Sequence, residues 1–465
     1  MTPQPRRSAD QPAPNRGEPR ELTLAVGAPA HGGHCVARPV DDPGGRVIFV
    51  RHALPGETVR ARLTEMTSRT WRADAVEILQ ASPDRVESVW PEAGPGGVGG
   101  GELAHVALDA QRTWKRWVLA DCLRRIGGQE VADAVAALPE ASAAAAVPIE
   151  PMPTDAAAQA SNSARRRALA GTATRTRVSL TVGEDGRAGM HAFRSGTVLP
   201  LRRLPLAVDA ITEIGLLERS RWRAHYRPGM RIEAIAPSGG EPVVLLDERL
   251  LTAQARSTGR RRVREVVDAS ALGLGELTYS VHAEGFWQVH VDAPRVLVER
   301  VVRGALGADL DGAAGSRVLE LYSGAGLFTL PLAALVGSDG EVVSLEGNEQ
   351  AVRDARRTLH DQPSARLTSG RVSARSVREL AGSLTGGRPD VVVLDPPRQG
   401  AGREVIEAVG ALGAERIVLV ACDPAALARD LGTLLRSGYA LGSMSALDMF
   451  PHTHHFETIA VLERS

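Results

Sequence analysis

The fold is indicated most clearly by SRVLELYSGAGLFTLPLAALVG, residues 316–337. Its first half is a short apolar run, which predicts a buried β-strand, and Gly324 and Gly326 predict a tight turn into a helix. Three further apolar runs follow, each before a helical segment: EVVSLEG (341–347), DVVVLDPPRQG (390–400) and RIVLVACDP (416–424). This alternation of strands and helices predicts a doubly wound parallel sheet, an α/β Rossmann-like domain over residues 276–465.

Chemically active side chains stand where these predicted strands end. They are Tyr322, Glu346, Asp395 and Cys422. In a doubly wound sheet, ligands bind outside the carboxyl ends of the strands, where the strand order reverses. We therefore expect these residues to surround one crevice.

The glycine turn favours a nucleoside ligand. Gly324 and Gly326 let the backbone approach a ligand, and Glu346 can accept hydrogen bonds from ribose hydroxyls. The pattern is shorter than the dinucleotide motif G-x-G-x-x-G, so it suits S-adenosylmethionine better than NAD. A tight turn without a ligand is the alternative. Asp395 opens DPPR, a stiff loop that can present a carboxylate to a flat base or serve only as a turn.

Cys422 and Glu457 are the candidate catalytic pair. A helix begins directly after Cys422, and a helix N-terminus favours thiolate over thiol, which makes a nucleophile; a buried core cysteine is the equal alternative. Glu457 follows 35 residues later, enough for one helix and a return strand, so it can reach the crevice as a general base. The histidines of DMFPHTHHFET (448–458) lack the two-histidine helix spacing of zinc hydrolases, and we predict no metal.

The rest of the chain suggests three more regions. Residues 1–20 read as a disordered Pro- and Arg-rich tail without the apolar core of a secretory signal. Residues 21–79 alternate apolar and polar positions between turns, which predicts a small β-barrel. Residues 80–275 form a β-rich central domain with an Ala/Pro-rich linker at 131–164. Between 155 and 265 there are 20 Arg against 11 acidic residues, which indicates either a solvated face or a nucleic-acid surface.

Composition excludes several classes of protein. The formal net charge is +0, so overall charge identifies no partner, and the three distant cysteines, Cys35, Cys122 and Cys422, cannot build a disulfide framework. The longest uncharged run is broken by Gly, Ser and Pro, which makes it a poor membrane span. We expect a cytoplasmic monomer without a membrane partner.

Four motifs in this order resemble the S-adenosylmethionine-dependent RNA (uracil-5-)-methyltransferases: LELYSGAGLFTLPLA, VVVLDPPRQG, ACDPAALARDL and DMFPHTHHFETIAVL. The segment GFWQVH (285–290) resembles a cofactor-binding motif of that family. GRVIFVRHALPGETVRARL (45–63) resembles the TRAM domain, a small OB-like barrel that binds RNA. The resemblance covers roughly residues 20–130 and 275–465.

Carried over motif by motif, the resemblance implies that Cys422 is the nucleophile and Glu457 the base that removes the carbon-5 proton. It implies that Gln288, Tyr322, Glu346 and Asp395 belong to the S-adenosylmethionine site. The implied substrate is a uridine in tRNA or rRNA, which must leave its stack to enter the crevice.

The sequence departs from the family pattern in two places. Many members carry a four-cysteine iron–sulfur site after the barrel, but PEAGPGGVGGGELAHV (91–106) has no cysteine, so we expect no cluster. The aromatic and arginine residues that often enter the central domain are thinned to GTATRTRVSL (171–180). An RNA cytosine-5-methyltransferase and a non-catalytic RNA-binding factor with a methyltransferase fold are the alternatives.

Overall fold

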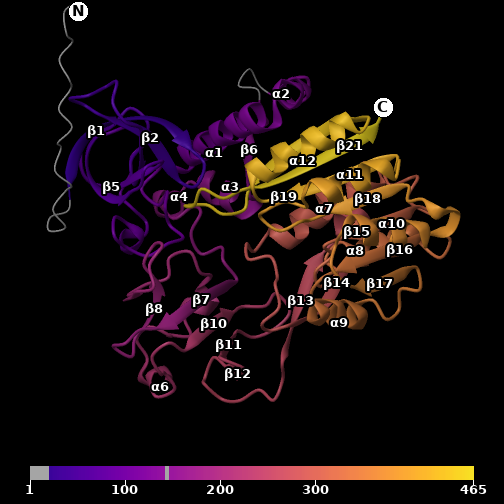
Figure 1. The fold of residues 1–465 in the computed structure, drawn as a ribbon. Coiled ribbons are helices and arrows are strands. Elements are labelled where there is room, and N and C mark those ends of the chain that lie inside the picture. Colours follow the sequence, from indigo (N-terminus) through magenta and orange to yellow (C-terminus); the bar gives the residue numbers. More distant parts are fainter. Residues whose placement is uncertain (1–19, 142–145) are drawn as a thin grey trace, which may run out of the picture. The chain divides into compact units, whose positions relative to one another are not determined.

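The computed structural model describes residues 20–141 and 146–465 (Figure 1). Almost all of the expected N-terminal tail lies outside the described residues. The described chain divides into two compact units. The first contains residues 20–30 and 34–83, and the second contains residues 31–33 and the rest of the chain from residue 84.

The first unit is a closed five-stranded barrel with strand order β1-β2-β3-β5-β4. Its strands alternate inward and outward side chains; in β4, for example, Val59 and Ala61 are fully buried, whereas Arg60 and Arg62 are exposed. The strands are β1 (Glu21–Ala30), β2 (His34–Pro39), β3 (Ile48–Arg51), β4 (Thr58–Met66) and β5 (Trp71–Gln80). This confirms the small β-barrel predicted at the N-terminus.

The second unit contains a six-stranded antiparallel sheet, with strand order β12-β11-β10-β7-β8-β9, and a separate hairpin. Trp222 is fully buried beneath the sheet, and its indole N–H donates to the carbonyl of Ile214 (3.0 Å). The sheet confirms a β-rich central domain. Its elements are β7 (Arg177–Val182), β8 (Ala188–His191), β9 (Val198–Pro200), α5 (Asp209–Thr212), α6 (Ser220–Arg223), β10 (Arg231–Ile235), β11 (Val243–Leu246) and β12 (Arg249–Thr252), followed by the hairpin β13 (Arg262–Asp268) and β14 (Glu276–His282).

The segment expected to be a linker, 131–164, contains ordered elements among its described residues. Helix α1 (Leu108–Cys122) precedes the segment. The elements that lie within it or overlap its ends are α2 (Gln129–Ala136), β6 (Ile149–Pro151), α3 (Pro153–Gln159) and α4 (Ala164–Ala168). Strand β6 pairs in parallel with β20 and forms the edge of the main sheet. The segment differs from the expected linker because β6 pairs with a strand about 300 residues later in the sequence, and helices form on both sides of it.

The main sheet has eight strands in the order β17-β16-β15-β18-β19-β21-β20-β6. Its elements are α7 (Ala293–Leu306), β15 (Arg317–Leu321), α8 (Thr329–Val336), β16 (Glu341–Glu346), α9 (Glu349–Thr358), β17 (Ala365–Ser369), α10 (Ala374–Gly382), β18 (Val391–Leu394), α11 (Arg403–Ala411), β19 (Arg416–Ala421), α12 (Pro424–Arg436), β20 (Tyr439–Asp448) and β21 (Glu457–Arg464).

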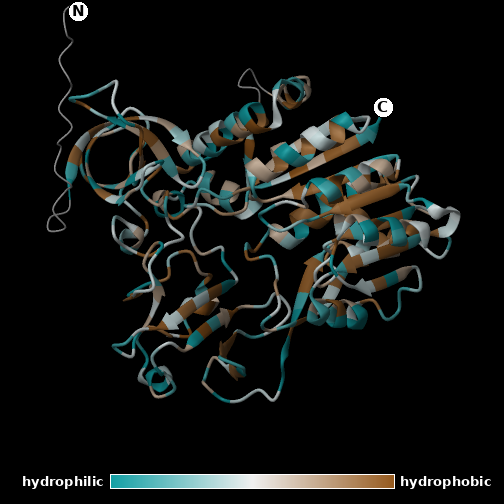
Figure 2. Ribbon diagram, viewed as in Figure 1, coloured by the Kyte–Doolittle hydropathy of each residue, from teal (hydrophilic) through white to brown (hydrophobic). Residues whose placement is uncertain are grey.

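Strands β15 to β19 of this sheet are parallel, and β21 inserts antiparallel between β19 and β20. Figure 2 shows these strands largely in brown, in keeping with the fully buried run Val392–Leu394 in β18. The doubly wound α/β fold is confirmed. The strand order reverses between β15 and β18, which places the ligand crevice at their carboxyl ends.

None of the described helices has the length and apolar character needed to cross a bilayer.

Candidate active site

The turn after β15 and the end of β16 are joined by the carboxylate of Glu346. The Gly324 N–H donates to one carboxylate oxygen of Glu346 (2.9 Å), and the Asn348 N–H donates to the other (2.6 Å). Tyr322, Gly324 and Gly326 all have positive φ angles (64°, 55° and 87°), which bends the backbone sharply outward. The structure thus brings four of the predicted cofactor residues together at the carboxyl ends of β15 and β16.

Gly326 is required by packing as well as by its φ angle. A Cβ at this position would lie 3.3 Å from both Ala355 Cβ and Leu359 Cδ1 of the α9 region. A side chain there would push the turn away from the helix. The glycine therefore keeps the turn close to α9.

Asp395 directly follows β18 at the strand-order reversal. Burial, helped by the nearby charge of Glu346, raises the pKa of Asp395 to about 7. The loop that follows is fixed to α12, because the Ala401 N–H donates to the Asp430 carboxylate (3.2 Å). Arg398, at the end of DPPR, is exposed and lies close enough to lower the pKa of Glu457.

Cys422 and Glu457 are brought together by the pairing of β19 with β21. Ala421 lies opposite Thr458 in the antiparallel ladder, and the Thr458 hydroxyl donates to the Ala421 carbonyl (2.7 Å). One position further toward the carboxyl end of β19, the corresponding residues are Cys422 and Glu457. Residues far apart in sequence thus become neighbours at the crevice.

The Glu457 carboxyl is held in an unusual environment. It is 6% exposed, and its Oε1 has no hydrogen-bond partner among the described residues. Burial first, and the charge of Asp395 second, raise the pKa of Glu457 well above its usual value, and Arg398 opposes the shift. A carboxyl of this kind is a candidate proton acceptor because its charged form is poorly stabilised.

The surroundings of Cys422 favour the protonated thiol. Burial, followed by the charges of Glu457 and Asp395, raises the pKa of Cys422 to about 12. The helix does not reverse this, because Asp423 caps α12 with its own carboxylate, which accepts from the Ala425 and Ala426 N–H groups (3.0 and 2.9 Å). Burial and the nearby acids thus oppose the expected effect of the helix N-terminus on the thiol, and the role of Cys422 as nucleophile stays a prediction.

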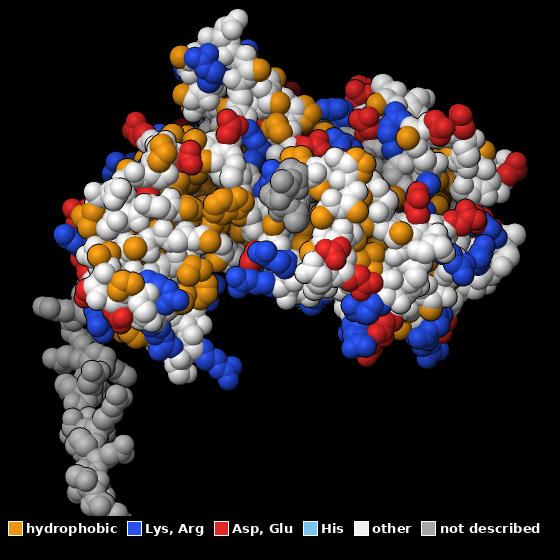
Figure 3. Space-filling model, turned by 90° about the horizontal axis from the view of Figure 1, so that it is seen from above, with side chains coloured by type: hydrophobic (Ala, Val, Ile, Leu, Met, Phe, Trp, Pro, Cys, Tyr) orange, Lys and Arg blue, Asp and Glu red, His pale blue; other side chains and the backbone are white. Residues whose placement is uncertain are grey.

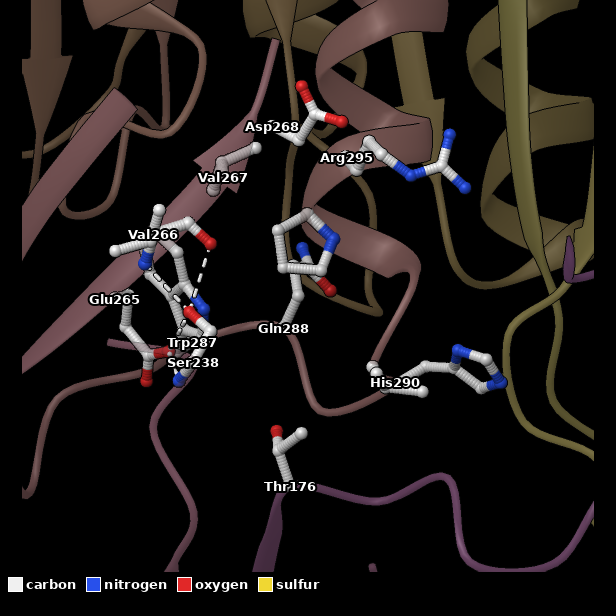
Figure 4. A pocket seen from close by; sticks show the side chains of 12 residues that line it. Thr176, Ser238, Glu265, Val266, Val267, Asp268, Trp287, Gln288, His290 and Arg295 are labelled. Carbon is white, nitrogen blue, oxygen red and sulfur yellow. Dashed lines mark hydrogen bonds between the residues drawn. The ribbon is translucent and has the colours of Figure 1, made fainter. Parts of the chain in front are cut away.

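Gln288 lies in the segment that follows β14 and is 8% exposed. It lines a hollow of about 200 Å³ bordered by β13, the segment 287–291 and the start of α7 (Figure 4). The hollow is also lined by Thr176, Ser238, Glu265, Val266, Val267, Asp268, Trp287, His290, Val291, Pro294 and Arg295. Of the predicted site residues, Gln288 alone lines this hollow.

Two aromatic residues connect the Gln288 segment to the glycine turn. Trp287 packs against Tyr279 with ring centroids 5.1 Å apart. The Tyr279 hydroxyl donates to the carbonyl of Leu327 (3.0 Å), the residue directly after Gly326. This contact fixes Gln288 relative to the turn, although the structure gives no direct contact between Gln288 and the other predicted residues.

The histidines of the 448–458 loop have different surroundings. Burial lowers the pKa of His452 to about 4, and its ring contacts Gln111 Nε2 (3.2 Å) and the Ala170 carbonyl (3.3 Å). Burial, together with His454 and Arg398, lowers the pKa of His455 to about 3. Within residues 20–141 and 146–465, no group of three or more metal-ligating side chains is placed to hold an ion. Burial and hydrogen bonds account for the surroundings of these histidines.

Two buried ionisable residues near the site were not predicted from the sequence. Glu320, in the middle of β15, is 1% exposed; burial raises its pKa to about 8, and it accepts from the Thr329 hydroxyl (2.6 Å). Lys115 is fully buried and forms an ion pair with Asp448, which ends β20 and begins the 448–458 loop. An acid inside the apolar run VLEL was a usable signal for Glu320, whereas nothing local identified the partner of Lys115.

Comparisons with known proteins agree with this geometry. The family model described as tRNA (Uracil-5-)-methyltransferase matches residues 275–465, and the TRAM domain model matches residues 18–76. An uncharacterized RNA methyltransferase of Streptomyces avermitilis is 39% identical over 468 residues, covering 95% of this chain and 98% of the relative. The 23S rRNA (uracil(1939)-C(5))-methyltransferase RlmD of Acinetobacter baumannii is 30% identical and covers 94% and 92%.

A solved structure shares the fold along most of the chain. It is the Pyrococcus abyssi tRNA (uracil-54, C5)-methyltransferase in complex with S-adenosyl-L-homocysteine, which is 20% identical with a TM-score of 0.62. The match covers 94% of this chain and 99% of that structure. With these matches, the chain belongs to the S-adenosylmethionine-dependent RNA (uracil-5-)-methyltransferase family and carries an N-terminal TRAM domain.

Proposed function

We propose that the protein transfers a methyl group to carbon 5 of a uridine in RNA, with Cys422 as nucleophile and Glu457 as general base. The proposal depends most on the placement of these two residues. Each lies one position beyond the Ala421–Thr458 pair, at the carboxyl end of the parallel strands. The printed names of relatives that act on uracil in 23S rRNA and in tRNA support the substrate class.

The turn at Tyr322, Gly324 and Gly326, together with Glu346, fits the nucleoside part of S-adenosylmethionine. The turn presents backbone where a side chain would obstruct a ligand, and each Glu346 oxygen keeps acceptor capacity after its one backbone hydrogen bond. Gln288 and Asp395 are proposed to complete the cofactor site. When bound, the cofactor supplies an electrophilic methyl group on a positively charged sulfur.

The chemistry of the target base explains why a cysteine is needed. Carbon 5 of uracil is a poor nucleophile, and addition of the Cys422 sulfur to carbon 6 gives an enolate that is nucleophilic at carbon 5. After carbon 5 has been methylated, Glu457 removes its proton. The carbon–sulfur bond then breaks, which restores the double bond and returns the sulfur as thiolate.

The surrounding charges set a condition on the first step. The thiol must lose its proton before it adds to carbon 6, yet burial, followed by the charges of Glu457 and Asp395, raises the pKa of Cys422 in the free protein. A positive charge among these acids lowers the pKa of every acid around it, including the thiol. Arg398 contributes one such charge, since it lowers the pKa values of both Cys422 and Glu457.

The function is tested with the full-length protein, methyl-labelled S-adenosylmethionine and RNA from a strain that lacks the gene. The RNA is digested to nucleosides, and label is expected in 5-methyluridine. Cys422→Ala should abolish the label, whereas Cys122→Ala, at a buried cysteine in α1, should retain it. Label in 5-methylcytidine, or in no nucleoside, would contradict the proposal.

A further inference from the structure

Helix α4 carries three consecutive arginines on an exposed surface. Residues 162–169 are all exposed, and they include Arg165, Arg166 and Arg167. Within residues 20–141 and 146–465, none of the three forms an ion pair; Arg167 donates to the Ser161 carbonyl (2.8 Å). On the face shown in Figure 3, basic and acidic side chains are interspersed, whereas the sequence from 161 to 169 contains no acid.

The C-terminal end of α4 is attached to the catalytic loop. The Ala170 carbonyl lies 3.3 Å from His452 Nε2, and His452 precedes Glu457 by five residues. Gly171 has a φ of +79°, and a Cβ there would lie 2.7 Å from the same His452 nitrogen. The backbone after α4 therefore packs directly on the loop that leads into β21 (Figure 1).

A buried carboxylate attaches the same backbone to the Gln288 segment. Asp155 accepts from the Gly171 N–H (3.0 Å) with one oxygen and contacts His290 Nε2 (3.1 Å) with the other. The Asp155 and His290 side chains are 5% and 1% exposed. The arginines are thus held by buried contacts to both segments that border the crevice, while their own side chains face solvent.

Exposed guanidinium groups at this position fit a phosphate backbone. Successive helical residues point about 100° apart, so three in a row spread over more than half of the helix surface and do not form one flat face. Such a spread suits a flexible single strand that bends into the crevice. Guanidinium groups bind phosphate oxygens in a bidentate manner and stay charged at any physiological pH.

We propose that Arg165, Arg166 and Arg167 bind the phosphates of the RNA strand that flanks the uridine entering the crevice. This inference rests on the proposed function, because it assumes an RNA substrate at Cys422 and Glu457.

The test compares two triple variants of the full-length protein. One changes Arg165, Arg166 and Arg167 to Ala. The control changes three arginines at the opposite ends of the parallel strands to Ala and so removes the same charge. They are Arg388 before β18, Arg436 at the end of α12 and Arg464 at the end of β21. Binding of a fluorescein-labelled, single-stranded 20-nucleotide oligouridine is measured by anisotropy between about 50 and 200 mM salt, the range over which phosphate contacts change affinity most.

The α4 variant should bind the oligouridine about tenfold more weakly than the wild type at low salt. The slope of log affinity against log salt should become less negative by about 2, since each single-strand phosphate contact contributes about 0.7. The control variant should keep the wild-type slope. Calorimetry should give both variants wild-type affinity for S-adenosylmethionine, and both should unfold at the wild-type temperature because the changed residues are exposed.

An α4 variant with the affinity and slope of the control would overturn the proposal and would direct the search toward an acidic protein surface as the partner of α4. The binding measurement requires no turnover. Weakened RNA binding by the α4 variant, combined with no 5-methyluridine from the wild type, would therefore contradict the proposed function and support the assignment of α4. Wild-type methylation with unchanged α4 binding would contradict only the assignment of α4.

Discussion

Replacing Lys115, the only lysine of the chain, with methionine should destabilise the protein strongly. Its ammonium is fully buried, donates to Asp448 and also donates to the Phe450 carbonyl (3.1 Å). Asp448 is only 3% exposed, so the substitution would leave a carboxylate in the core without its counter-ion. Breaking a buried pair on one side typically costs about 3–5 kcal/mol.

The double variant Lys115→Met/Asp448→Asn separates the charge from the packing. Asparagine keeps the size of aspartate but carries no charge, so the remaining cost is that of unsatisfied polar groups, about 1–3 kcal/mol. The control is Arg125→Met, because the Arg125–Asp121 pair is 75% and 43% exposed and should contribute little, about 0–1 kcal/mol.

The free energy of unfolding is measured from urea titrations followed by tryptophan fluorescence and circular dichroism, with the slope held constant across variants. A loss below about 1 kcal/mol for Lys115→Met, or an equal loss for the single and double variants, would refute the reasoning that a buried charge is left unpaired.

Three further predictions concern catalysis and domain roles. Arg398→Met should move the rising limb of the profile of kcat/KM against pH to higher pH, because Arg398 lowers the pKa values of Cys422 and Glu457, which must both lose protons; Arg403→Met, at an exposed residue paired with Glu407, should leave the profile in place. Deleting residues 1–83 should weaken RNA binding measured by filter assay much more than cofactor binding measured by calorimetry, and an equal loss of both would count against separate roles. Anaerobically purified protein should contain no stoichiometric iron or sulfide, because residues 91–106 contain no cysteine; an iron–sulfur absorption band would overturn that expectation.

The strands of the main sheet could be predicted because each is an apolar run that ends at a residue with a clear local meaning. Gly324, Asp395 and Cys422 follow such strands, and the doubly wound topology then places all three at the carboxyl end of the parallel strands. The distance in sequence from Cys422 to Glu457 was also sufficient, since a helix and a return strand fill it.

The parts that could not be predicted depend on partners distant in sequence. Strand β6 is recognisable only through its pairing with β20, because three residues carry no periodic signal. Lys115 and Asp448 meet across 333 positions. The surroundings of Cys422 could not be predicted for the same reason: the sequence shows the helix that follows, but not the burial, nor the neighbouring acids Glu457 and Asp395, that raise the pKa of the thiol.

A covalent bond between Cys422 and RNA would show the roles of Cys422 and Glu457 without intermediate inference. Wild type, Cys422→Ala, Glu457→Gln and the double variant are incubated with RNA and S-adenosylmethionine and run on a denaturing gel. Because the sulfur adds before the base is needed, Glu457→Gln should accumulate a slow band that contains methylated RNA, and both variants that lack Cys422 should show none. Substantial turnover by Cys422→Ala, or normal turnover without a slow band for Glu457→Gln, would contradict the assignment of nucleophile and base.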